Sequence, residues 1–527
     1  MKLERLHEYI IPAVATLAGM VLAVKVGSLT GAGSLGAMSN ILLGVASIAL
    51  VVWLRAKTWI LIALTWDLSG SVPLTNLPLG VRDFVVLVVL GSYVIFYAVK
   101  LIRVSTRLDM VDFLIGLMLL YLLTVYIRNP VGTAALGSEK VGGRPYFDAG
   151  IAFLAFAVLS RAPVDSQSLR RMPFYLLIAT ALTSLASLGI SLFPAFGAPL
   201  GSIYSGFAPA EGVVQADVTE RQQGLSWGSN NGMRLLCSYF PPITLLIPLY
   251  FWRFSAASAC MAGVLLSGFR SSLVTVVLYS VLSSFFQRRI KDIVIIGIIG
   301  AAMITLLGLG NRRIFTLPLA VQRALTMFPG NWDPIAEANA KDSTQWRLEM
   351  WRIVLNEDRY IQNRVFGDGY GFTRSELATM ISEQLGGQGF YGGARQESFM
   401  ISGMFHSGPL STIRYVGYIG LFIYTSLIVL MATRAWKLVR AVEGTPYFPA
   451  VLFVGMSIII SPFVFYFIAG AFQYNLPDTI FAAGLLKLLE RGVNADSAHR
   501  GKPNHISARI QDSPSPLALT RPRVRVQ

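Results

Sequence analysis

The chain has 527 residues, of which 54% are hydrophobic and only 14% are charged. A soluble globular protein carries about 25% charged residues, so this composition excludes an ordinary soluble domain. The formal net charge of +16 would suggest a nucleic-acid partner in a soluble chain. Basic cytoplasmic loops account for it in a membrane protein, and we expect no nucleic-acid binding. The two cysteines, Cys237 and Cys260, lie in apolar runs, which predicts neither a disulfide framework nor a zinc site.

Long apolar runs recur along the chain. Runs of roughly 18–22 residues have the length of transmembrane helices, so we predict an all-α polytopic membrane protein with about fourteen transmembrane helices. The first run follows a basic start that resembles a signal peptide, and we interpret it as an uncleaved helix. The predicted spans are about 9–24, 38–54, 58–69, 83–102, 109–127, 147–160, 173–194, 232–252, 254–269, 271–286, 292–309, 412–433, 448–469 and 477–489.

Basic residues divide the loops into two sets. Lysine and arginine gather in the short loops at about 55–57, 100–107, 161–171, 253, 288–291 and 434–440, and in the C-terminal tail. The positive-inside pattern assigns such loops to the cytoplasm, which predicts that both termini are cytoplasmic. We therefore divide the chain into eleven or so spans within 1–309, a large outer loop subdomain at 310–405, spans within 406–490, and a disordered basic tail at 491–527.

The large outer loop carries three local signals. Ser343 or Thr344 is predicted to cap a helix that continues to about Tyr360. The segment Phe366–Phe372, which reads F-G-D-G-Y-G-F, predicts a tight glycine-rich turn. It lacks the strand–turn–helix context of a nucleotide site. Gly386–Gly393 is flexible by composition.

His406 stands where the large loop meets the next apolar run. The other three histidines lie in segments predicted to be cytoplasmic. If a base works at neutral pH on the outer face, His406 is therefore the available imidazole. The alternative is an interfacial histidine that reaches toward water and has no catalytic role.

Arg270 lies between two apolar runs with almost no loop, in the sequence L-L-S-G-F-R-S-S-L-V. Its guanidinium fork matches phosphate oxygens, which favours an anion site. The alternative is that it caps a helix end or pairs with a buried carboxylate. Arg221 and Arg347 are weaker candidates when each is considered alone, because arginines in outer loops are often solvated.

Four short patterns occur in one order between about residues 200 and 435. They are Arg221, Gly224, Asn230 and Asn231; Arg270 with Ser271 and Ser272; Arg347-x-x-x-Trp351 followed by Phe366–Gly371; and His406-Ser407, nine residues, then Gly417-x-x-Gly420. In these patterns the chain resembles the O-antigen ligase and polymerase superfamily of membrane glycosyltransferases. It departs from the family at Phe269, where serine is more common.

The resemblance implies an inverting, metal-independent glycosyl transfer at the periplasmic face of the bacterial inner membrane, without a cofactor. The donor would be an oligosaccharide on undecaprenyl pyrophosphate, and the partners would include the lipid bilayer and other polysaccharide-assembly proteins. The implied catalytic residues are His406, Arg270 and Arg347. The implied substrate-binding residues are Arg221, Asn230, Asn231, Trp351, Ser407 and Arg414.

Three functions remain open at this point. In a polymerase the acceptor is another lipid-linked glycan, which the long chain and high span count favour. In a ligase the acceptor is the lipid A core. A polysaccharide transporter or flippase would instead predict interrupted helices with polar residues near the middle of the membrane. The polar candidates gather at the outer boundary, which favours an enzyme.

Overall fold

The computed structural model describes residue 45 and residues 49–71, 79–102, 108–132, 140–205, 223–385 and 393–499. These ranges are predominantly helical and contain no β-strand beyond two isolated bridges, Val141 with Phe372 and Asn311 with Phe315. The all-α fold class is therefore confirmed for the described part of the chain. The described residues exclude Arg221, the predicted span 9–24, most of 38–54, nearly all of the Gly386–Gly393 stretch and the tail from residue 500 onward. The prediction of disorder from residue 491 was wrong for residues 491–499, which continue the last helix.

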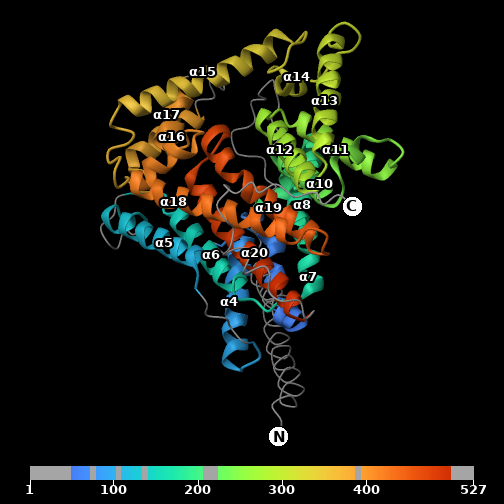
Figure 1. The fold of residues 1–527 in the computed structure, drawn as a ribbon. Helices are drawn as coiled ribbons and strands as arrows, with labels where there is room; N and C mark the ends of the chain where they lie inside the picture. Colours follow the sequence, from blue (N-terminus) through green and yellow to red (C-terminus); the bar gives the residue numbers. More distant parts are fainter. Residues whose placement is uncertain are drawn as a thin grey trace, which may run out of the picture.

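The helices up to residue 310 fall at most of the predicted spans (Figure 1). They are α3 Trp59–Thr65, α4 Val81–Ala98, α5 Met110–Arg128, α6 Arg144–Leu159, α7 Ser166–Arg170, α8 Met172–Leu192, α9 Gly197–Ile203, α10 Gln223–Tyr239, α11 Phe251–Leu266, α12 Arg270–Phe286 and α13 Ile290–Gly310. The predicted run 232–252 is not one helix. It ends at Tyr239 because Pro241 and Pro242 follow, and proline cannot continue an α-helix.

The remaining helices form the large loop and the C-terminal bundle. The loop contains α14 Leu319–Leu325, α15 Pro334–Asn356, α16 Arg374–Leu385 and α17 Gly393–Ile401. The bundle contains α18 Gly408–Ala441, α19 Phe448–Phe463, which continues as a π-helix over Val464–Ile468, and α20 Phe472–His499. Figure 1 shows α15 running across the top of the molecule, with α16 and α17 beneath one of its ends.

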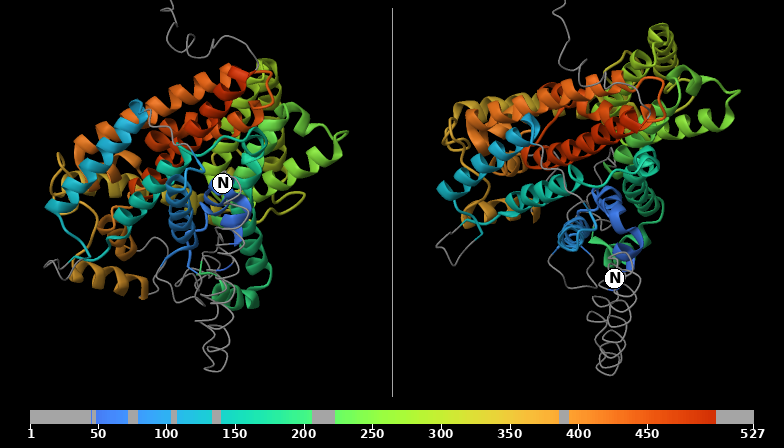
Figure 2. Two further views of the ribbon diagram at one scale, coloured as in Figure 1. Left: turned by 90° about the horizontal axis from the view of Figure 1, so that it is seen from below. Right: turned by 60° about the horizontal axis from the view of Figure 1, so that its bottom comes forward.

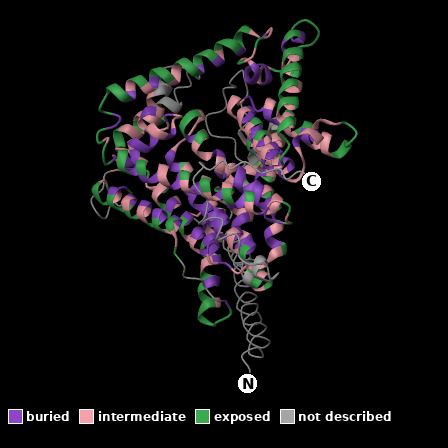
Figure 3. Ribbon diagram, viewed as in Figure 1, coloured by how far each residue is buried: buried purple, intermediate pink, exposed green. Residues whose placement is uncertain are grey.

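Six described helices are long and apolar enough to cross a membrane, so the chain is a multi-pass membrane protein. The six segments are Val81–Ala98, Met110–Arg128, Met172–Ile190, Ile290–Gly310, Gly408–Ala441 and Phe448–Ile468. Two shorter apolar helices, α11 and α12, accompany them. Along α13 almost every turn exposes a large apolar side chain (Figure 3). That pattern is typical of a lipid-facing helix.

The core of the bundle is built around α18, α19 and α20. In both views of Figure 2 these helices run side by side, with α5 against α18 and α6 against α20. Buried aromatic side chains fill the space between them, and the Tyr424 ring contacts Phe465 at 5.0 Å and Phe472 at 5.4 Å. This packing fixes the position of the start of α18, where His406 and Ser407 lie.

Ion pairs connect neighbouring loops at one end of the bundle. Lys57 contacts Asp165 at 2.9 Å, and Arg288 contacts Glu443. The first contact joins the segment before α3 to the segment before α7. The second joins the α12–α13 loop to the α18–α19 loop. The loops joined in this way are the ones that the basic-residue pattern assigned to a single side.

Helix α15 begins ten residues earlier than predicted. Its N-cap is Asp333, whose carboxylate accepts a 2.9 Å hydrogen bond from the Ile335 N–H, and Pro334 occupies the first helical position. Aspartate followed by proline is a strong helix start. Ser343, the predicted cap, is buried in the middle of the helix, and the helix ends at Asn356 rather than near Tyr360. The predicted start at Ser343 or Thr344 was wrong because the Asp333-Pro334 pair is a stronger local start signal ten residues earlier.

Candidate functional site

Helix α15 is the element on which the Arg270 and Arg347 segments meet. Arg270 is the first residue of α12, where the chain leaves an extended Phe269. Its Nη2 donates to the Ala340 carbonyl at 3.2 Å and to the Thr344 hydroxyl at 3.4 Å. Arg347 lies half-buried on the same helix, three residues after Thr344. Residues three or four apart on a helix are neighbours on its surface, so the two arginines belong to one region.

The next turn of α15 joins this region to His406. Trp351 follows Arg347 by four residues, and its Nε1 donates a 2.7 Å hydrogen bond to the Phe405 carbonyl. The half-buried His406 ring lies 5.7 Å from the Trp346 ring and 5.3 Å from the Phe399 ring, measured between centroids. Segments of three of the four sequence patterns therefore converge on α15.

The backbone of His406 is strained. Its φ is +51°, in the left-handed region that residues other than glycine seldom adopt. Such a conformation costs on the order of 1–3 kcal/mol and persists only where the surroundings enforce it, as often happens at functional sites. Here the Trp351 bond to Phe405 and the two rings hold the residue. His406 is thus positioned by its backbone as well as by its side chain.

Ser407 is the N-cap residue of α18. Its backbone is extended, and its carbonyl accepts the Ser411 N–H at 3.0 Å, but its hydroxyl makes no capping hydrogen bond. The next residue, Gly408, packs closely against Phe465 and Gly470. A Cβ added to Gly408 would lie 2.4–2.5 Å from atoms of Phe465. The close approach of the α19–α20 connection therefore requires glycine here.

Gly417 breaks helix α18 where the glycine-rich segment docks. Its φ of +66° and ψ of −173° are not helical, and a Cβ there would lie 2.2 Å from the Val365 carbonyl oxygen. Two backbone hydrogen bonds join the glycine-rich segment to α18 near the break. The Asp368 N–H donates to the Arg414 carbonyl at 2.9 Å, and the Gly369 N–H donates to the Tyr415 carbonyl at 3.0 Å. The two patterns that contain these glycines thus form one backbone junction.

Arg414 stabilises this junction. Its Nη1 contacts the Asp368 carboxylate at 2.7 Å, and the two side chains are 12% and 9% exposed. The same carboxylate accepts the Gln362 N–H at 2.9 Å and the Asn363 N–H at 2.8 Å. This ion pair gives Arg414 a structural role. A role in substrate binding stays a prediction.

Asn230 and Asn231 lie on α10, away from these contacts with α15. Near the start of α10, Ser226 contacts Ser272, two residues after Arg270. Asn230 is half-buried, and its Oδ1 has no hydrogen-bond partner among the described residues. Asn231 lines a polar pocket deeper in the bundle. The structure therefore associates the predicted substrate residues with two regions.

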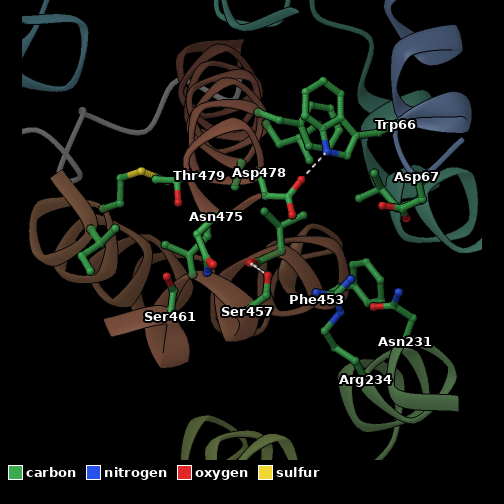
Figure 4. A pocket seen from close by; sticks show the side chains of 18 residues that line it. Trp66, Asp67, Asn231, Arg234, Phe453, Ser457, Ser461, Asn475, Asp478 and Thr479 are labelled. Carbon is green, nitrogen blue, oxygen red and sulfur yellow. Dashed lines mark hydrogen bonds between the residues drawn. The ribbon is translucent and has the colours of Figure 1, made fainter. Parts of the chain in front are cut away.

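The second region is a pocket of about 280 Å³ between α3, α8, α10, α18, α19 and α20 (Figure 4). Its charged lining residues are Asp67, Arg234 and Asp478. Trp66 Nε1 donates to Asp478 at 2.9 Å, and the Arg234 guanidinium lies 4.0 Å from the centre of the Phe453 ring.

Sequence reasoning missed this pocket although a signal was present. Asp67, Arg234 and Asp478 each fall inside a predicted span, 58–69, 232–252 or 477–489. Ionisable residues within transmembrane segments are costly and usually functional.

Comparison with known proteins does not identify a family, since no protein-family model and no curated protein matches the sequence. Within the described ranges, no group of three or more histidine, cysteine, aspartate or glutamate side chains could hold a metal ion. The site must therefore be interpreted from its own geometry.

Proposed function

We propose that the chain is an inner-membrane glycosyltransferase that polymerises O-antigen or exopolysaccharide repeat units at the periplasmic face. The donor is a glycan carried on undecaprenyl pyrophosphate. The observation that carries the proposal is the meeting of the Arg270, Arg347 and His406 segments on α15. Two guanidinium groups can stabilise the charge on a pyrophosphate leaving group without a metal, and an imidazole can accept the proton of the attacking hydroxyl.

The proposal includes a topology with about fourteen spans, residues 310–405 in the periplasm and both termini in the cytoplasm. The positive-inside pattern supports it. So do the ion pairs that join the basic loops to one another. Cysteine labelling of intact cells tests it at Asp342 on α15 and Lys437 on α18, both exposed. An impermeant reagent should label Asp342→Cys and spare Lys437→Cys, and the reverse pattern would refute both the topology and the mechanism.

The reaction is a single displacement with inversion. An acceptor hydroxyl oxygen attacks the anomeric carbon of the donor sugar and forms the new glycosidic C–O bond. The bond from that carbon to the pyrophosphate oxygen breaks, and its electron pair leaves with the lipid pyrophosphate. His406 accepts the hydroxyl proton or orients the hydroxyl for attack.

Arg270 and Arg347 stabilise the charge that develops on the leaving pyrophosphate. Arginine presents five N–H donors in a planar fork that matches phosphate oxygens. A preorganised donor aimed at developing charge strengthens its interaction in the transition state. Arg270 is the first residue of helix α12, and Arg347 lies within helix α15. Both arginines therefore extend from helices.

The same chemistry with lipid A core as the acceptor defines a ligase, which is the alternative enzyme. A deletion strain distinguishes the two. Loss of a polymerase leaves single repeat units on the cell surface, whereas loss of a ligase leaves long chains on the carrier lipid. An unchanged glycan profile in the deletion strain would contradict both.

A transporter or flippase is the second candidate, and two observations favour it. Helix α18 is interrupted at Gly417 and α19 passes into a π-helix after Pro462. The charged pocket also lies between helices rather than at the outer boundary. Interrupted helices around a polar site are typical of transporters. Purified protein that forms no product but moves lipid-linked glycan across vesicles would support this candidate and contradict the enzyme.

A further inference from the structure

The pocket of Figure 4 contains groups that the proposed reaction does not use. Its volume of about 280 Å³ is many times the roughly 10–15 Å³ needed to hold one water molecule. Its lining comes from six segments, most of them helices of the bundle. Asp67 and Asp478 both present surface to it. The cavity therefore has room for a ligand larger than water.

The charges around this pocket are of both signs. Asp67 and Asp478 would repel an anion, and the guanidinium of Arg234 offsets part of their attraction for a cation. Figure 4 shows these three side chains around the same cavity. Arg234 Nε has no hydrogen-bond partner among the described residues. The set offers both strong acceptors and a strong donor, which suits a neutral ligand that carries hydroxyl groups.

The uncharged lining has the same mixed character. The remaining polar residues are two amides and three hydroxyls, from Asn231, Asn475, Ser457, Ser461 and Thr479. Ser457 donates its own proton to the Val454 carbonyl at 2.9 Å, so its oxygen is available as an acceptor. Such convergent polar groups fix the orientation of a small ligand.

Aromatic rings supply apolar walls. Trp66 and Phe481 stack with their centroids 4.0 Å apart and their planes 5° from parallel, and the hydrogen bond to Asp478 holds the indole in place. Phe453 forms another wall beside Arg234. A pyranose ring combines hydroxyls at its rim with apolar C–H groups, so it matches a cavity lined by both apolar side chains and polar groups.

The pocket is connected to the start of α18. Asn475 Oδ1 accepts the Ala471 N–H at 2.9 Å, and the Phe472 N–H donates to the Ser411 hydroxyl at 3.0 Å. Ser411 lies in the first turn of α18, five residues after His406. Two hydrogen bonds through Ala471 and Phe472 therefore connect a residue of the pocket lining to the first turn of α18, which follows His406.

From this geometry we infer that the pocket binds one neutral sugar ring of the glycan substrate, with Asp478, Asn475 and Arg234 bonded to its hydroxyls. This inference rests on the proposed function for the source of the sugar. The binding of a free sugar can be measured without any transfer reaction.

The test is protection of an engineered thiol in the full chain reconstituted in lipid nanodiscs. Ser457→Cys places a thiol in the pocket, and unaltered protein measures the background from Cys237 and Cys260. A water-soluble methanethiosulfonate reagent is applied with glucose, galactose, mannose, rhamnose or N-acetylglucosamine. At least one of these sugars should slow labelling saturably, and the open-chain polyol sorbitol should not.

Matched substitutions assign the effect to the pocket. Adding Asp478→Asn should weaken protection roughly 10- to 100-fold, the range expected when a hydrogen bond to a charged group is lost. The same change at Asp342, exposed on α15, should leave protection unaltered. Failure of all five sugars to protect, protection by phosphate or sodium instead, or equal protection in the two variants would overturn the inference.

The two proposals fail separately. Loss of sugar protection in a protein that still forms polymer would overturn the pocket assignment alone. Sugar protection in a wild-type protein that forms no product would overturn the proposed reaction alone. In His406→Gln the inference expects protection to persist while product formation falls.

Discussion

The region where α15 meets Arg270 and His406, called the α15 junction below, and the polar pocket hold their candidate side chains by different means. At the α15 junction and at the neighbouring break of α18, the backbone contributes to the positioning through the left-handed His406 and through Gly417. In the pocket, side chains from six separate segments converge between helices. The junction should therefore respond to changes in backbone freedom, whereas the pocket should respond to changes of single polar atoms that leave the backbone alone.

The largest expected effect is at His406. His406→Ala and His406→Gln should each lower product formation by roughly 10²- to 10⁴-fold, the usual contribution of a positioned acid or base. Membrane abundance should not change. The measurement is polymer formed from lipid-linked donor across a range of pH, with Trp346→Phe as a control for ring packing. Near-normal turnover by His406→Gln would reduce the residue to an orienting partner and contradict the base assignment.

The arginines come next. Arg270→Ala and Arg347→Ala should each slow the reaction by about 10²- to 10³-fold, as expected for loss of a donor that stabilises developing charge. Lysine at either position should rescue poorly because an ammonium lacks the planar fork. Arg352→Ala, an exposed neighbour on α15, is the matched control and should retain activity. Wild-type turnover by either test variant at normal expression would exclude that residue from pyrophosphate binding.

A substitution at Gly417 tests whether the break in α18 depends on the backbone freedom of glycine. Gly417→Ala places a methyl group 2.2 Å from the Val365 carbonyl at a φ of +66°. The combined strain and overpacking should cost roughly 2–4 kcal/mol of stability, seen as a lower melting temperature in detergent. Gly91→Ala in α4, where a Cβ meets no atom within 4 Å, should not lower it. Equal melting temperatures for the two variants would mean that the break at Gly417 does not require glycine.

The ion pair beneath the glycine-rich segment should give the smallest effect. Asp368→Asn keeps the shape but removes the charge opposite Arg414, and should cost about 1–3 kcal/mol. If the two residues act as a pair, the double variant with Arg414→Gln should lose less than the sum of the single losses. Thermal unfolding of the four proteins measures this coupling. Strictly additive losses would show that Arg414 acts elsewhere.

The sequence predicts the helices better than it predicts the contacts between them. The span at 109–127 corresponds to α5 at Met110–Arg128, because its apolar length and its Asp109 cap are both local signals. Arg270 at a helix start could likewise be recognised from its short loop. The pairing of Arg414 with Asp368 joins residues 46 positions apart and depends on how the glycine-rich segment docks, which no local pattern encodes.

The pocket lies at the limit of what a single sequence reveals. Its three charged residues could be noticed one at a time within apolar runs, but their convergence depends on the packing of α3, α10 and α20. Local backbone strain could not be predicted either, because the sequence around His406 gives no signal for its positive φ. What could be predicted were the residue types near the site. What could not be predicted was which of them meet.

The central claim is that the α15 junction catalyses glycosyl transfer at the outer face. The most direct test combines purified full-length protein with purified undecaprenyl-pyrophosphate-linked repeat units, in the absence of other proteins and with a metal chelator present. The account predicts that wild-type protein forms longer lipid-linked glycan and that Arg270→Ala and His406→Gln form almost none. Equal product from all three proteins, or none from the wild type with either lipid-linked glycan or lipid A core as acceptor, would contradict it.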